Sequence, residues 1–103
     1  MSKLKSITCI VECGMAPEVV KAALIAGAEG ATIFFGVGTG VRQRLGSLGK
    51  LINPDKDIIT IVTDEEKVEK IFNAMVEKGN LKEPAKGFAY IQSVDKVIGF
   101  LPY

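Results

Sequence analysis

Two strand–helix–strand segments follow one another in this chain of 103 residues, and that order limits the fold more than any other feature of the sequence. In the first segment, β-branched and apolar residues predict a strand over 6–13. Pro17 then suits the first turn of a helix, whose apolar residues recur at helical spacing and which stops before Gly30. Residues 31–35 predict the next strand, so the first half of the chain is expected to form one βαβ unit.

The second segment repeats this layout. Residues 57–63 and 87–94 predict strands. Between them, residues 63–79 predict the clearest helix of the chain, with Thr63 or Asp64 as its N-cap and acidic residues in its first turn. A short extended tail follows the last strand. The helix carries an apolar stripe that we expect to lie in the core, formed by Val68, Ile71, Phe72, Met75 and Val76.

Two interleaved βαβ units predict an α+β fold of the ferredoxin-like, split βαβ kind, in which an antiparallel sheet carries both helices on one face. The length favours a single domain over 1–103. The strands are apolar on both sides, because Ile10 alternates with Val11 and Ile61 alternates with Val62. A strand with one solvated face should alternate with polar residues. We therefore expect other copies of the chain to cover the second face of the sheet in a small symmetric oligomer.

The composition argues against several classes of function. The net charge is only +1, so the chain is no polycation and nucleic acid is not an expected partner. The longest uncharged run, from Gly30 to Val41, has 12 residues. A membrane span needs about 20, so no membrane insertion is expected. Two cysteines form no disulfide framework, which favours reduced thiols and a cytoplasmic location.

The chain has no histidine, which removes the most frequent general base and metal ligand. We therefore expect no catalytic residues and no metal site. Two alternatives stay open. The first is a small enzyme that uses acids or a cysteine nucleophile. The second is a ferredoxin-like trimer that binds a metal or another small ligand without sensing a nucleotide. The candidate residues for these alternatives are Cys9, Glu12, Cys13, Asp55, Asp57, Asp64 and Glu65.

A long segment over about 36–56 joins the two βαβ units and contains Arg42 and Arg44, which are the only arginines of the chain. Its glycines match neither nucleotide-binding motif: Val41 stands in place of the third glycine of G-x-G-x-x-G, and Arg44 in place of the first glycine of the P-loop. One interpretation is a solvated hairpin connection. The other is a flexible arm that becomes ordered on a protein partner, with the arginines donating paired hydrogen bonds to carboxylates or phosphates. The candidate partner-binding residues are Gly40, Arg42, Gln43, Arg44, Leu45, Ser47 and Lys50.

The stretches GATIFFGVGTGVRQRLG (30–46) and PAKGFAYIQSVDKVIGF (84–100) resemble the P-II signal-transduction proteins, in the wording of a divergent branch of that family. The resemblance extends over nearly the whole chain. It implies a non-enzymatic, ferredoxin-like homotrimer with a long T-loop between the second and third strands. It also implies that a small anionic effector binds in a cleft between subunits. The loop then acts on a membrane transporter or a metabolic enzyme, in the best-known members as part of nitrogen regulation.

The resemblance also suggests where an effector binds, with departures from the family pattern. Lys86 and Gly87 fall in the family's phosphate-binding B-loop, but Phe88 stands where the nitrogen regulators carry a lysine, and Gln43 is displaced from the 2-oxoglutarate-binding position. ATP, ADP or AMP is therefore a candidate effector whose binding we expect to be weakened. Val62 matches the place where the family binds adenine through its backbone. The predicted effector-binding residues are Gly36, Gly38, Val62, Lys86 and Gly87.

Overall fold

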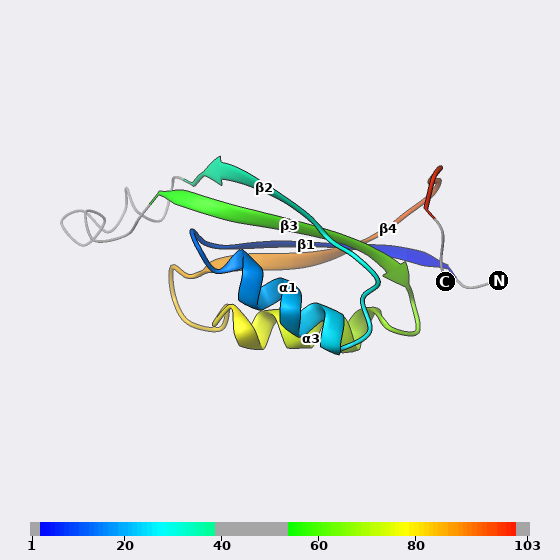
Figure 1. The fold of residues 1–103 in the computed structure, drawn as a ribbon, viewed down its shortest axis with the longest axis horizontal. Helices are drawn as coiled ribbons and strands as arrows, with labels where there is room; N and C mark the ends of the chain where they lie inside the picture. Colours follow the sequence, from blue (N-terminus) through cyan, green and yellow to red (C-terminus); the bar gives the residue numbers. More distant parts are fainter. Residues whose placement is uncertain (1–2, 39–53, 101–103) are drawn as a thin grey trace.

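The computed structural model describes residues 3–38 and 54–100, which form a four-stranded antiparallel sheet with two helices on one face (Figure 1). The strand order is β2-β3-β1-β4. This arrangement confirms the predicted ferredoxin-like fold. The elements in chain order are β1 (Leu4–Glu12), α1 (Ala16–Ile25), β2 (Thr32–Val37), β3 (Asp55–Asp64), α3 (Val68–Lys78) and β4 (Gly87–Ser93).

The segment between β2 and β3 is shorter than the predicted arm over 36–56. Strand pairing continues to the partners Gly36 and Lys56, and Val37 pairs with Asp55. Beyond them the Gly38 N–H donates a hydrogen bond of 2.7 Å to the Pro54 carbonyl. The two ends of the predicted arm therefore form the stem of a hairpin, because pairing satisfies backbone groups that a loop would leave to water. The arm residues from Gly40 to Lys50, with both arginines, lie outside the described residues.

Both helices are shorter than the sequence predicts, for local reasons. α1 ends well before Gly30, because Gly27, with φ +121°, and Ala28 donate their N–H groups back to the carbonyls of the last turn. α3 begins after the predicted position 63, because Asp64 first closes a separate turn. The Asp64 Oδ1 atom accepts hydrogen bonds of 3.0 and 3.1 Å from the N–H groups of the second and third residues after it. Asp64 is thus a cap, as predicted, but of the turn that precedes the helix.

The core lies between the helices and the helix-facing side of β1 and β3. Alternate residues of each strand point toward it, as period-two strands require. In the predicted stripe of α3, Phe72 and Val76 are only partly buried. Burial raises the pKa of the Cys9 thiol to about 11, whereas Cys13 is exposed and the two thiols are not bonded to each other. The largest fully buried side chains are Ile7, Cys9, Val11, Val19, Ile59, Ile61, Ile71 and Met75.

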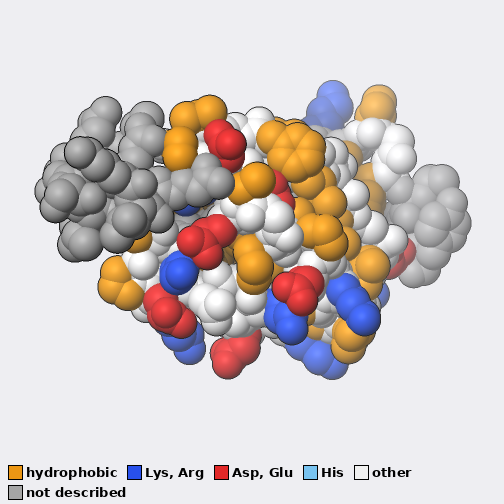
Figure 2. Space-filling view, turned by 60° about the vertical axis from the view of Figure 1, so that its left-hand side comes forward, with side chains coloured by type: hydrophobic (Ala, Val, Ile, Leu, Met, Phe, Trp, Pro, Cys, Tyr) orange, Lys and Arg blue, Asp and Glu red, His pale blue; other side chains and the backbone are white. Residues whose placement is uncertain are grey.

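The opposite side of the sheet, which we call the bare face, has no helix over it (Figure 1). One apolar row crosses all four strands on this face: Phe34 pairs with Ile58, Ile58 with Ile10, and Ile10 with Phe88. Phe34 is 50% exposed and Phe88 is 56% exposed. Figure 2 shows hydrophobic side chains gathered on the upper part of the molecule, while most charged side chains in that view lie lower. The alternation of Ile10 with Val11 and of Ile61 with Val62 does place apolar residues on both faces, although Ser6, Thr8 and Thr60 also lie on the bare face.

Asp57 at the start of β3 is the most buried charged side chain of the described residues, with 2% of its surface exposed. Its Oδ2 atom accepts hydrogen bonds from the N–H groups of Gly14 at 2.9 Å and Ala16 at 3.1 Å. The carboxylate therefore caps the N-terminus of α1 from a neighbouring strand, where the helix dipole favours a negative charge. This contact gives Asp57 a structural role, although its sequence position also made it a candidate acid of the enzyme alternative.

Replacing Asp57 with alanine should lower the free energy of unfolding by about 1–3 kcal/mol, because the buried N–H group of Ala16 and the partly buried N–H group of Gly14 lose their acceptor. Urea denaturation of both proteins measures the change. The control is Asp95→Ala, at an exposed position after β4, which should change stability by less than about 0.5 kcal/mol. Equal stability of the Asp57 and Asp95 variants would contradict the capping role.

Candidate effector site

One end of the sheet collects the base of the β2–β3 hairpin and the turn that precedes β4. Because all pairings are antiparallel, β1 and β2 end where β3 and β4 begin. Gly36 pairs with Lys56, and Lys56 pairs with Glu12 on the next strand. Lys86 comes directly before Gly87, the partner of Val11, and so continues this row. We call Gly36, Lys56, Glu12 and Lys86 the end row.

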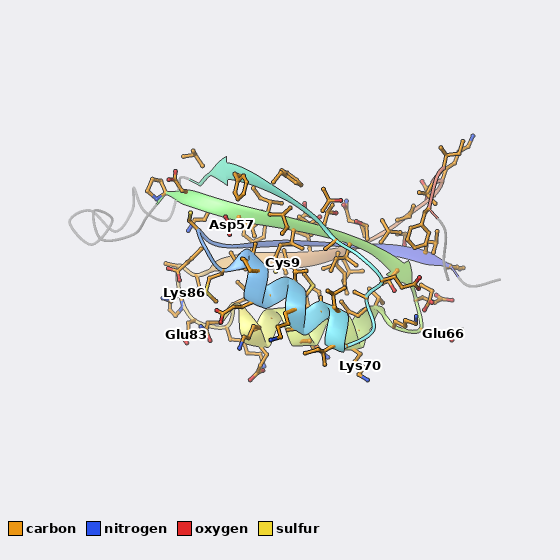
Figure 3. All side chains as sticks on the ribbon, viewed as in Figure 1. Cys9, Asp57, Glu66, Lys70, Glu83 and Lys86 are labelled. Carbon is orange, nitrogen blue, oxygen red and sulfur yellow. The ribbon has the colours of Figure 1, made fainter. Side chains whose placement is uncertain are left out.

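An ion pair joins two members of the end row. The Lys86 ammonium lies 3.5 Å from Oε1 of Glu12, and the two side chains are 35% and 43% exposed. Figure 3 shows Lys86 at the end of the sheet from which the grey segment after β2 leaves. Lys86 therefore lies at the same end of the sheet as the hairpin base, with β1 between them.

Lys56 lies against the hairpin base through its aliphatic stem. A Cβ atom added at Gly38 would meet Lys56 Cε at 3.3 Å and Lys56 Cγ at 3.4 Å, so the stem passes directly beside the Gly38 backbone. The Gly38 N–H is already bonded to Pro54, and a phosphate contact from that group would require the loss of this hydrogen bond. Sequence reasoning missed Lys56 and named Glu12 only for the enzyme and metal alternatives, not as an effector-site residue. Only the strand register, which the sequence pattern leaves open, brings both into one row with Lys86.

Gly87 has a structural reason to be glycine. Its φ is +128°, and an added Cβ would overlap the backbone carbonyl of Ile10 on β1. Ala85, two residues earlier, also has a positive φ, of 64°. The positive φ angles of Ala85 and Gly87, on either side of Lys86, therefore place Lys86 in the end row. Gly87 lets β4 approach β1 closely enough to pair.

Gly87→Ala should lower the free energy of unfolding by at least about 2 kcal/mol, because the new methyl group has no space beside β1 and the backbone conformation is strained. Thermal or urea denaturation tests this. Gly30→Ala is the control, since Gly30 has no positive φ and open space where its Cβ would be. If both variants keep wild-type stability, the close approach of β4 to β1 does not depend on glycine.

Val62 lies apart from the other predicted effector residues. It pairs with Ser6 and sits six residues beyond Lys56 along β3, which corresponds to about 20 Å. There it lines a surface cavity of about 280 Å³ with Glu29, Gly30, Ala31, Thr32, Thr60 and Phe100. The single chain therefore brings Gly36, Gly38, Lys86 and Gly87 to one end of the sheet and holds Val62 near the other.

The family model described as "Nitrogen regulatory protein P-II" matches residues 4–100. This chain belongs to the P-II family. Among solved structures, PII of Arabidopsis thaliana bound to citrate has a similar fold, with a TM-score of 0.69 and 24% sequence identity. The match covers 90% of this chain and 78% of the Arabidopsis chain. No curated protein matches the sequence.

Family membership places the chain among regulatory signalling proteins that bind small effectors and partner proteins and are not enzymes. The recognition made from GATIFFGVGTGVRQRLG and PAKGFAYIQSVDKVIGF is thereby confirmed. Across residues 3–38 and 54–100, no three cysteine or acidic side chains are grouped to hold a metal ion. Neither helix of the described chain is long and apolar enough to cross a membrane.

Proposed function

We propose that this protein is a trimeric P-II-type regulator. It binds a small anionic effector, an adenine nucleotide, at the end row and controls a membrane transporter or a metabolic enzyme through the arm that follows β2. The observation that carries the proposal is the position of the end row. Lys56 lies in the base of the β2–β3 hairpin, and Lys86 with its turn lies at the same end of the sheet, across β1. The segment that contains both arginines follows β2 in the sequence. A ligand there can bias the arm directly. The cytoplasmic location stays a prediction from the sequence.

The bare face supports the trimer. Phe34 and Phe88, at the two ends of the apolar row, are both half-exposed. Tyr90, whose ring stacks on Phe88 with 6.1 Å between centroids, is 41% exposed. A contiguous apolar surface of this kind marks an interface, because leaving it in water favours aggregation. Three sheets that face one another around a threefold axis would cover all three bare faces.

The separation of Val62 from Lys86 supports an effector site between subunits. A distance of about 20 Å along β3 is too great for one nucleotide to contact both residues of the same chain. A nucleotide can reach the phosphate-side residues of one subunit and the Val62 backbone of the next if the two sheet edges meet. The effector would then stabilise the trimer as well as the hairpin base.

In solution the protein should have a mass about three times the 11.0 kDa of the chain. Light scattering at micromolar concentration measures it. Phe88→Asp should dissociate the trimer, because a charge would be buried at the interface without a partner. Ile25→Asp is the control: Ile25 is 77% exposed but lies on α1, in the layer away from the bare face, so this variant should stay trimeric. A monomeric wild type would overturn the proposed assembly.

The double variant Arg42→Ala with Arg44→Ala should lose partner binding and keep the wild-type mass and melting temperature, because the two guanidinium groups are proposed to anchor the arm on an acidic or phosphorylated surface. Affinity capture with the tagged protein, followed by mass spectrometry of what it retains, measures the loss. Lys21→Ala with Lys70→Ala removes the same charge from the helices and should leave capture unchanged. If the arginine variant unfolds the trimer, the arginines are structural and the signalling role of the arm is refuted.

A further inference from the structure

Resting on the proposed effector site, we propose that Glu12 sets its charge selectivity. In the effector-free protein the Glu12 carboxylate is paired with the Lys86 ammonium, in the position that an anionic ligand would take. When an anion enters, Glu12 stays beside it and disfavours ligands that carry several negative charges. The site should therefore prefer an effector with one phosphate group over a polyphosphate. This preference should be stronger than in a site that contains only the two lysines.

The register of the sheet fixes the place of Glu12 between the two lysines. Glu12 is the last residue of β1, the strand between β3 and β4, and it pairs with Lys56. On its other side it forms the 3.5 Å ion pair with Lys86. An anion that binds both ammonium groups must therefore pass over, or displace, this carboxylate.

The two lysines are not equivalent before an anion arrives. Within the described parts of the chain, Lys56 forms no ion pair, and its stem is held against Gly38. Lys86 is held by Glu12. An entering anion can meet the ammonium of Lys56 first and gains Lys86 only by replacing Glu12. The end row carries two positive charges and one negative charge, so its net charge is +1.

Repulsion from Glu12 grows with the charge of the ligand. Orthophosphate carries about −1.5 charge at neutral pH, whereas tripolyphosphate carries about −4. Each additional ligand charge within about 6 Å of the carboxylate should weaken binding about threefold in a water-exposed site. Lys86 and Glu12 are both more than a third exposed, so their pairing adds little to stability and the ion pair is not needed to hold the fold.

The test titrates the full-length protein with orthophosphate, pyrophosphate and tripolyphosphate, and follows the amide NMR signals of Lys56, Lys86 and Gly87. In E12Q the affinity for orthophosphate should rise about fivefold and the affinity for tripolyphosphate at least about tenfold. The double variant E12Q/K56Q should lose most of the phosphate affinity that E12Q gains. The control is E83Q, which deletes one acid from the same turn at an exposed position and should change neither affinity more than about twofold.

Three results would overturn the role of Glu12: an equal gain for all three phosphates in E12Q, the same pattern in E83Q, or no response of the end row to any phosphate in wild type and E12Q. Calorimetry with ATP, ADP and AMP tests the proposed nucleotide effector separately from the role of Glu12. If ATP binds no more tightly than tripolyphosphate, the site does not recognise adenine and the nucleotide proposal fails. The dependence of affinity on phosphate charge would still support Glu12 as the selecting residue.

Discussion

β1 pairs with β3 on one side and with β4 on the other, and both registers place Ile7, Cys9 and Val11 under the helices. Because side chains alternate with a period of two, the same registers place Ile10 and Glu12 on the bare face. A slip of one residue would exchange these sets, burying Glu12 in the core and exposing the aliphatic residues. The core, the apolar row and the end row therefore all depend on one pairing.

The pairing is secured by contacts at the end of the sheet that carries the candidate site. Asp57 ties the start of β3 to the start of α1 through two N–H groups. Gly87 lets the start of β4 lie against the Ile10 carbonyl, and the Gly38–Pro54 hydrogen bond closes the hairpin base. Each contact joins segments far apart in the chain. A ligand at the end row thus meets a firmly held end of the sheet.

Much of this fold could be predicted from the sequence, because strand and helix periodicity are local properties. The order of the elements, the stripe of α3 and the apolar character of both sheet faces followed from residue spacing alone. The ends of the elements were less predictable. α1 ends at a glycine motif around Gly27, and the turn closed by Asp64 delays α3. Cross-strand pairing turned both ends of the predicted arm into strand. These ends depend on which hydrogen bonds compete successfully in three dimensions.

The sequence by itself determined the fold class, the family and the concentration of arginine in one connecting segment, since all three are written in residue order and type. Only the tertiary structure decided which charges meet. Glu12 and Lys86 are 74 residues apart, and nothing in the spacing between them predicts that β1 lies beside β4 in the register that joins them. Asp57 likewise changed from a candidate acid to a helix cap once β3 lay beside α1. The role of a charged side chain depends on the groups around it, and the packing of distant segments determines which groups those are.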